Sequence, residues 1–215
     1  MKVKWLGVAS FLITSDKGIR IIIDPYKSGG LIKSAEYKGP ADIVTISHAH
    51  DDHSYTANIQ GNPQIIRDIK PTEAKGIKFN GVAAFHDEVQ GKKRGPNNVI
   101  YFDVDGMRVC HLGDLGHMLN DEQIAQIGKV DVLLTPVGGE WAIDAASAWD
   151  IANKLHAKVA IPMHFRDERC NFPIGTVDDF LKGKKNVIRM DSSEIELKAG
   201  KLPAETTIIV LKPAL

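Results

Sequence analysis

The stretch Ser47-His48-Ala49-His50-Asp51-Asp52-His53 constrains this chain most, because it has the pattern His-x-His-x-Asp-His within six positions. An apolar run over residues 42–46 precedes it and predicts a buried strand, so the histidines begin where a rigid element ends. Side chains alternate on an extended backbone, so His48 and His50 point the same way and can share one metal ion. Asp52 and His53 lie past the bend and can face a second ion. The alternative is a polar surface loop, but packing alone gives no reason for this density of ligands.

Length and composition predict one ordinary globular unit. A chain of 215 residues with 43% hydrophobic and 25% charged residues is expected to form a single domain over residues 1–215, without need of disulfides. Its two cysteines are far apart, and Cys110 lies in an apolar strand as a small core residue. The formal net charge is zero, so we expect no nucleic-acid partner. The sequence has no signal peptide and no segment that could span a bilayer, which predicts a cytoplasmic protein; a homo-oligomer is compatible with it.

The pattern of elements changes halfway along the chain. The first half predicts strands at residues 3–6, 10–14, 19–23, 77–85, 99–102 and 107–112, with loops at 26–40 and 88–98 and a weak pattern between 54 and 75. The second half alternates, with helices at 122–127, from the Asp144 cap to about 156 and at 177–181, and strands at 130–135, 158–161 and 206–211. These elements predict an α/β (α+β) fold in which a sheet packs on a sheet with helices outside.

Three further potential ligands follow predicted strands. His86 comes after residues 77–85, Asp114 after residues 107–112, and His164 after residues 158–161. A lone histidine is more often a surface or core side chain than a ligand, and a lone Gly-Asp is usually a turn. The repetition of one topological position, beside a motif already rich in ligands, favours a shared site at one rim of the sandwich.

These motifs together resemble the metallo-β-lactamase superfamily of metal-dependent hydrolases. Within it the chain is similar to the branch that contains the ascorbate-phosphate lactonase and the N-acyl-phosphatidylethanolamine phospholipase D relatives. The resemblance runs over nearly the whole chain, through residues 5–7, 23–25, 48–53, 111–117, 130–139 and 161–164. It implies a four-layer αββα sandwich, with two mixed β-sheets packed face to face and helices outside. The chain departs from the branch at Val8, where many members have a histidine, and at Glu140-Trp141.

The resemblance also implies a ligand set for two divalent ions. His48, His50 and His86 would bind the first ion; Asp52, His53 and His164 would bind the second; and Asp114 would bridge them. Zinc is the first expectation, and manganese or iron is also compatible with these ligands. Two such ions can hold a hydroxide nucleophile between them, and Asp52 and Asp114 are therefore the expected catalytic residues. Asp24 is either an acceptor for a ligand imidazole or an ordinary Asp-Pro turn at a strand end.

Three residues are candidates for substrate binding. Arg94, in a basic loop after His86, suits an anionic group, and Asn97 follows it in the pattern of the branch. His117, three residues after Asp114, could bind substrate or donate a proton to a leaving group. Each has a plain alternative as part of a solvated loop. Trp141 either lines the pocket or packs beneath it, and His111 and His156 are interpreted as structural.

The leading hypothesis is a metal-dependent hydrolase that cleaves an ester, lactone or phosphodiester bond in a small, anionic metabolite. One alternative is a nuclease, against which the neutral net charge argues. A di-iron redox protein is another, but members of that kind usually carry a flavin domain, for which 215 residues leave no room. The last alternative is a non-enzymatic, metal-stabilised binding protein.

Overall fold

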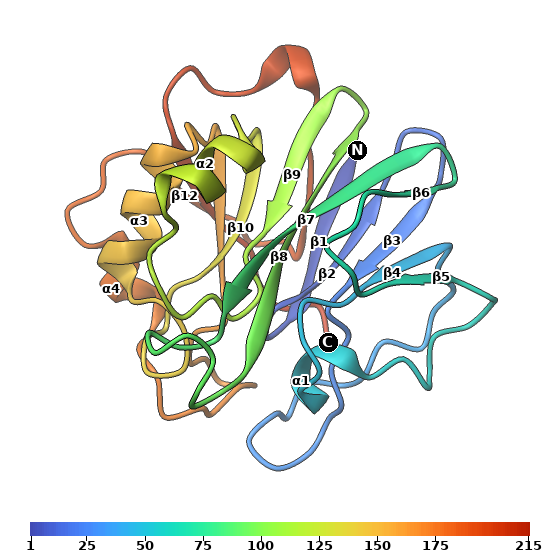
Figure 1. Cartoon of the computed structure of the whole chain (residues 1–215), viewed down its shortest axis with the longest axis horizontal. Helices are drawn as coiled ribbons and strands as arrows, with labels where there is room; N and C mark the ends of the chain where they lie inside the picture. The colour runs from blue at the N-terminus through green and yellow to red at the C-terminus, as the bar shows by residue number, and fades with distance from the viewer.

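The computed structural model describes residues 1–215 and contains two mixed β-sheets packed face to face (Figure 1). The first sheet has six strands, in the order β13 (Glu194–Glu196), β1 (Lys2–Gly7), β2 (Ser10–Thr14), β3 (Arg20–Ile23), β4 (Ile43–Thr45) and β5 (Gln64–Ile66). The second has eight, in the order β12 (Val187–Arg189), β14 (Thr207–Val210), β11 (Val159–Met163), β10 (Val132–Pro136), β9 (Met107–His111), β8 (Pro96–Val104), β7 (Ile77–Phe85) and β6 (Thr72–Ala74).

Each sheet combines antiparallel hairpins with parallel strands. In the first sheet β1, β2 and β3 are antiparallel, whereas β3, β4 and β5 run parallel. In the second sheet β6 to β9 are antiparallel, whereas β9, β10, β11 and β14 run parallel. As a result β4, β7, β9 and β11 all end at the rim of the sandwich that carries the short helix α1 (Asp51–Ser54) (Figure 1).

The core follows from the two-residue period of the strands. On β3, Ile21 and Ile23 belong to the main hydrophobic cluster between the sheets, while Ile22 belongs to a smaller cluster on the other face. The main cluster contains 50 buried residues and continues through the eight-stranded sheet to the helices outside it, so it supplies most of the hydrophobic stabilisation.

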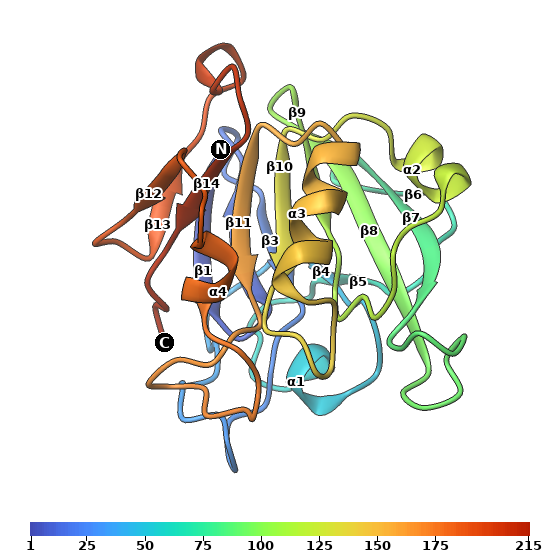
Figure 2. The same cartoon turned by 90° about the vertical axis from the view of Figure 1, so that its left-hand side faces the viewer.

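Helices cover only one face of the sandwich. Helices α2 (Asp121–Ile127), α3 (Ala145–Lys154) and α4 (Val177–Leu181) all lie outside the eight-stranded sheet (Figure 2). A short 3₁₀ helix (Ala199–Lys201) precedes β14. None of the helices combines the length and the apolar character that a bilayer crossing requires.

The predicted fold class is confirmed, but the fourth layer differs from the expectation. On the outer face of the six-stranded sheet, Ile22 and Val44 pack against loop residues such as Tyr26, Ile32 and Ala41. The loops over residues 24–42 and 55–63 carry Gly29-Gly30, Gly39-Pro40 and Gly61-Asn62-Pro63. Glycine and proline break a helical pattern, so loops cover this face, in agreement with the loop predicted over residues 26–40.

Local capping agrees with the sequence. Asn120 accepts a hydrogen bond from the backbone of Gln123, and Asp144 accepts one from Ser147, so α2 and α3 begin where predicted. The sequence missed β5, β6 and α1, which have three, three and four residues. The predicted loop over residues 88–98 was wrong at its end, because β8 begins at Pro96 and pairs there with Phe85 of β7.

Candidate metal centre

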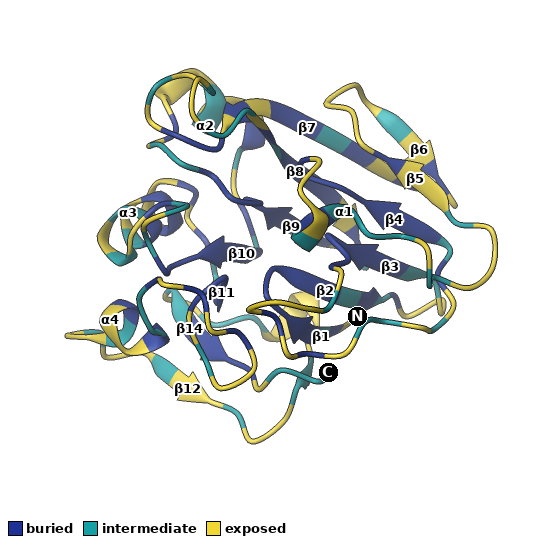
Figure 3. Cartoon of the chain, turned by 90° about the horizontal axis from the view of Figure 1, so that it is seen from below, coloured by how far each residue is buried: buried dark blue, intermediate teal, exposed yellow.

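The predicted ligands meet at one rim of the sandwich. His48 and His50 follow β4, Asp52 and His53 lie on α1, and the strands β7, β9 and β11 lead to His86, Asp114 and His164 respectively. Figure 3 views the molecule from this end, where α1 lies over the ends of the two sheets. Segments 111 residues apart in the sequence are therefore adjacent in the fold, since His53 and His164 contribute to one group of potential ligands.

The first group of potential ligands consists of His48, His50 and His86, whose ligand atoms all lie within 4.8 Å of one another. Nε2 of His48 is 3.1 Å from Nδ1 of His50, and the ring of His86 lies 4.9 Å from the ring of His48. Three imidazole nitrogens at this spacing have the arrangement that one divalent ion requires.

The second group consists of Asp52, His53, Asp114 and His164, again within 4.8 Å. Oδ2 of Asp114 lies 3.1 Å from Nε2 of His53 and 3.3 Å from Nε2 of His164. The same oxygen lies 3.3 Å from Nε2 of His86, which belongs to the first group. Asp114 therefore stands between the two groups, in the position that a bridging carboxylate would occupy.

The donor set fits a cation. Nε2 of His53, Nε2 of His164 and Oδ1 of Asp114 are buried and make no hydrogen bond. Buried polar atoms are nearly always partnered, and an unpartnered group costs ~1–3 kcal/mol. Several such atoms directed at one point are satisfied together by a divalent ion, so the residues present match the implied metals.

Electrostatics also favour a bound cation. Burial opposes ionisation of Asp114, but His164 and His53 outweigh it and hold the pKa of this carboxyl well below its usual value. Burial and the neighbouring His53 lower the pKa of His48 to about 3, so its imidazole is neutral. At His53 burial opposes the charged form, yet Asp114 and Asp52 raise the pKa well above its usual value. The site thus attracts positive charge, for which a proton and a metal ion compete.

Asp24 and Ser47 form a hydrogen-bonded network beneath the ligands. Nδ1 of His53 lies 2.8 Å from Oδ2 of Asp24, and the hydroxyl of Ser47 donates to the same oxygen. Oγ of Ser47 also lies 2.9 Å from Nδ1 of His48. Asp24 is fully buried, so of its two predicted roles the acceptor for a ligand imidazole has the supporting geometry. Sequence reasoning missed Ser47, whose only signal was its position directly before His48.

Asp114 is held by close backbone packing. Gly113 has a φ of +58°, and a Cβ there would collide with the side chains of Asn97 and Ser47. Asn97 is fully buried: its amide donates to the carbonyl of Leu112, and its Oδ1 accepts from the backbone N–H of Asp114. The predicted substrate contact of Asn97 has no supporting geometry, because both ends of its side chain are used to position the Asp114 turn.

Arg94 is presented by a loop built around Asp87. The two carboxylate oxygens of Asp87 accept four backbone N–H groups, from Val89, Gly91, Lys93 and Arg94, at 2.8–2.9 Å. Burial raises its pKa, but these four bonds outweigh burial and lower it to about 2. The sequence analysis did not predict this role of Asp87. Only its hydrogen bond with Val89, two residues further on, belongs to a local turn that aspartate commonly forms.

The side chain of Arg94 faces the ligands. One of its N–H groups donates to the carbonyl of Glu140 at 3.1 Å. Arg94 and Lys93 line a cavity of about 290 Å³ together with Asp52, Asp114 and Trp141. The basic loop and the Glu140-Trp141 segment thus meet over the candidate metal centre, where an anionic group could contact Arg94.

His117 does not have a free proton donor. Its Nε2 accepts the backbone N–H of Phe85 at 3.1 Å, and its Nδ1 lies 2.8 Å from the carbonyl of Met118. Both ring nitrogens are occupied by backbone groups, so the predicted role in protonating a leaving group has no supporting geometry. The ring lines a neighbouring cavity of about 400 Å³ and so remains close to the site.

The remaining residues singled out in the sequence are structural here. Val8 has a φ of +53°, is buried in the outer cluster, and its carbonyl accepts the backbone N–H of His164. His111 is buried, with Nε2 2.9 Å from the carbonyl of Ala9. His156 is exposed after α3, and Cys110 is fully buried in β9. Strained positive φ angles at Val8, Asp24 and His164 surround the centre, as is common at functional sites.

Comparison with protein families gives one match that includes every candidate ligand. A model described as the beta-lactamase superfamily domain matches residues 2–164 of this chain. The match therefore extends from the first strand to the last of the seven ligands.

Individual relatives agree with this match. A protein of Thermococcus onnurineus named UPF0173 metal-dependent hydrolase is 29% identical over 191 residues, covering 77% of this chain and 84% of the relative. A protein of the same name from Archaeoglobus fulgidus is 29% identical over 235 residues, covering 93% and 97%. A crystal structure from Thermotoga maritima, described as a candidate zinc-dependent hydrolase of the metallo-β-lactamase superfamily, is 36% identical. The alignment covers 98% of this chain and 97% of that one, with a TM-score of 0.82.

Proposed function

This chain belongs to the beta-lactamase superfamily and is a metal-dependent hydrolase, and on this premise we propose that it cleaves an ester, lactone or phosphodiester bond in a small anionic metabolite. The observation that carries the proposal is the convergence of seven His and Asp ligands in two groups that meet at Asp114. The predicted branch, with its lactonase and phospholipase D relatives, defines the first substrates to test.

Two divalent ions would be held by the two groups of ligands. His48, His50 and His86 would hold one ion, Asp52, His53 and His164 the other, and Asp114 would bridge them. Zinc is the first candidate, supported by the description of the Thermotoga maritima relative, and manganese or iron also suits imidazole and carboxylate ligands. When bound, such ions lower the pKa of a coordinated water and polarise the oxygen of the scissile group.

The residues of the chain prepare the site for this chemistry. Asp24 and Ser47 would accept hydrogen bonds from Nδ1–H of His53 and His48, which leaves the Nε2 lone pair of each ring for a ligand bond. Burial raises the pKa of Asp52, but His53 and His164 outweigh it and lower the pKa to about 2, so this carboxylate is ionised. Its side chain is 23% exposed, so it can orient the attacking water and accept a proton from it.

Charge favours an anionic substrate. The two carboxylates Asp52 and Asp114 supply two negative charges, so two divalent ions would leave the centre positive. Arg94 and Lys93 add positive charge to the wall of the same cavity. Arg94 is half-buried and retains N–H groups beyond the one bonded to Glu140, which suits a carboxylate or phosphoryl group.

The test combines metal reconstitution with a substrate panel. The purified protein is stripped by a chelator and reloaded separately with zinc, manganese or iron. It is then assayed against lactones, carboxylic esters and phosphodiesters, each in an anionic and a neutral version. The proposal predicts hydrolysis by a metal-loaded form, with a preference for the anionic version. Absence of hydrolysis across all three bond classes, with the metals bound, would contradict it.

A further inference from the structure

Two hollows border both the candidate ligand Asp52 and the side chain of Trp141. The first, which we name the metal chamber, has a volume of about 290 Å³ and contains Asp52 and Asp114 together with Lys93 and Arg94. The second, which we name the Leu31 hollow, has a volume of about 410 Å³ and is lined by Leu31, Ile32 and Phe172. Asp52 and Trp141 border both hollows, so a group bound at the centre has access to each.

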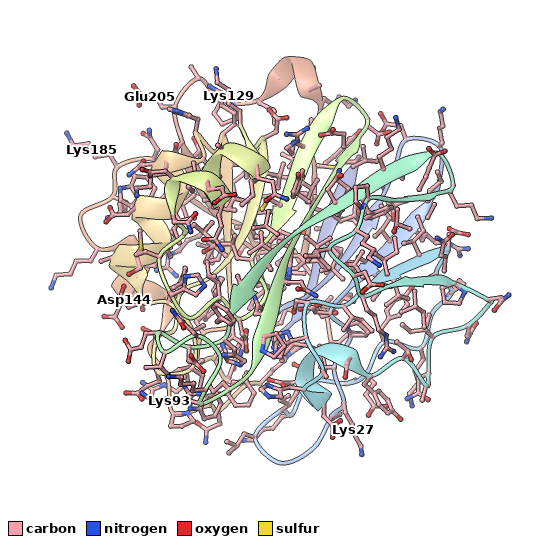
Figure 4. The ribbon with its side chains drawn as sticks, viewed as in Figure 1. Lys27, Lys93, Lys129, Asp144, Lys185 and Glu205 are labelled. Carbon is pink, nitrogen blue, oxygen red and sulfur yellow. The ribbon has the colours of Figure 1, made fainter.

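The two hollows differ in chemistry. Lys93 and Arg94 give the metal chamber a cationic wall. In the other hollow Leu31, Ile32, Phe172 and Trp141 form an apolar wall, and Lys27, Ser28, Gly29, Asp51 and Asp52 complete its lining. Figure 4 labels Lys93 and Lys27, and the two lie well apart along the same lower rim of the molecule. Lys93 lines the metal chamber and Lys27 lines the Leu31 hollow, so these two parts of the linings lie apart.

The back wall of the Leu31 hollow reaches a metal ligand. The ring of Phe172 lies 5.0 Å from the ring of Trp141 and 5.4 Å from the ring of His164. Phe172 is only 6% exposed, so its ring is fixed between these neighbours. An apolar surface therefore begins directly beside the second group of ligands and leads outward.

Leu31 is exposed yet firmly held. Its side chain is 44% exposed, at the tip of a turn closed by hydrogen bonds between Gly29 and Ile32 at 2.9 and 3.0 Å. The carbonyl of Leu31 also accepts the backbone N–H of Asn171 at 2.9 Å. A single exposed leucine is common on protein surfaces, but this one stands on a fixed turn above an apolar wall. Its position suits contact with a ligand, because little ordering entropy would be lost on binding.

From this arrangement, and resting on the proposed function, we infer that the substrate is amphipathic. Its anionic group binds at the metals beside Arg94, and an unbranched apolar substituent runs past Asp52 and Trp141 into the Leu31 hollow. A wholly polar substrate would leave the apolar wall in water and gain nothing from it. An apolar chain would bury part of Leu31 and Phe172 and add affinity with each methylene group.

The inference is tested by binding, independently of turnover. The probes are methyl, butyl, hexyl and octyl phosphate, titrated calorimetrically into the zinc-loaded protein. A fully buried methylene contributes ~0.8 kcal/mol, which corresponds to about a fourfold gain in affinity. We expect a gain of about two- to fourfold for each methylene until the hollow is filled. Equal affinity for methyl and hexyl phosphate, or no binding of any alkyl phosphate, would overturn the inference.

A pair of variants locates the effect. Leu31→Ser should reduce the ratio of hexyl to methyl phosphate affinity at least severalfold, and its exposed position makes misfolding a minor concern. Ile188→Ser is the matched control, since Ile188 is 48% exposed on β12 and lines neither hollow. The control should keep the wild-type ratio. An unchanged ratio in Leu31→Ser would place the chain elsewhere and overturn the inference.

Binding and hydrolysis also separate the two proposals. Binding that increases with chain length, combined with no hydrolysis of any bond class, would contradict the proposed function and leave the amphipathic site standing. Hydrolysis without any dependence on chain length in the binding series would support the function and overturn the amphipathic site.

Discussion

Nδ1 of His53 lies 2.8 Å from a carboxylate oxygen of Asp24, and this contact connects the second group of ligands to the first. The same oxygen accepts the hydroxyl of Ser47, whose Oγ lies beside Nδ1 of His48. One buried carboxylate thus fixes the orientation of an imidazole in each group. A change at Ser47 or Asp24 should therefore be felt at both metal positions.

Replacing Ser47 by alanine should weaken metal binding without removing a ligand. The variant loses the partner of Nδ1 of His48, and loss of such a partner typically costs ~10–100-fold in metal affinity. Competition titration with a chromophoric chelator measures the change. Ser54→Ala is the matched control, because the hydroxyl of Ser54 bonds only backbone carbonyls of Ala49 and His50. Wild-type affinity in Ser47→Ala would show that the network does not support the ligands.

Substituting Gly113 by alanine should destabilise the fold. A non-glycine residue at left-handed φ costs ~1–2 kcal/mol, and the clash with Ser47 and Asn97 should add ~1–3 kcal/mol. Gly30→Ala separates the two costs, since Gly30 has the same φ of +58° but nothing within 4 Å of an added Cβ. Urea denaturation of both variants gives the free energies of unfolding. Equal losses in the two variants would rule out the close approach at Gly113 as the cause.

Replacing Arg94 by alanine should weaken the binding of anionic substrates. A charge-assisted hydrogen bond contributes ~1.5–3 kcal/mol, so KM should rise about 10- to 100-fold while the metal content stays the same. Lys92→Ala is the control, because this exposed lysine lies in the same loop but lines neither hollow. Steady-state kinetics on matched anionic and neutral substrates decides the matter. A similar rise for both substrates would remove the proposed role of Arg94 in recognising charge.

The charge of Asp87 should stabilise the loop that carries Arg94. Four backbone N–H groups outweigh burial and lower its pKa to about 2, so the folded protein favours the ionised form. This contribution is fully present above about pH 4, the usual range of an aspartate, and is lost as the pH falls towards 2.

Comparison with Asp87→Asn isolates this contribution. Thermal unfolding of the metal-free proteins should show the wild type more stable than the variant at pH 7. The difference should shrink between about pH 4 and pH 2. A difference that is independent of pH over this window would mean that the charge of Asp87 does not support the loop.

The sequence identified the potential ligands that meet at the rim, because their signal is chemical and local. His48, His50, Asp52 and His53 are adjacent in the chain, and His86, Asp114 and His164 each follow a strand with a clear apolar pattern. Their convergence follows from strands that end at one rim. The fold class could also be predicted from local patterns, because the chain changes halfway from hairpins to alternating strands and helices.

The residues that position the potential ligands could not be predicted from local sequence patterns. Ser47 acquires its role from a contact with Asp24, 23 residues away, and a serine beside a strand end has no distinctive pattern. The branch pattern predicts a substrate contact for Asn97, and the place of Asn97 within β8 depends on long-range pairing with β7 that the local sequence does not show. The loop over residues 26–40 was predicted, but its packing against Ile22 and Val44 depends on contacts that the local sequence does not show.

The central claim is a pair of metal ions that share Asp114. Native mass spectrometry of the zinc-reconstituted protein counts the ions bound to each chain, in the wild type and in Asp114→Ala. The account predicts two ions in the wild type and loss of both full occupancy and hydrolysis in the variant, since Oδ2 of Asp114 faces His53, His86 and His164. Two ions retained in Asp114→Ala, or a single ion in the saturated wild type, would contradict the account.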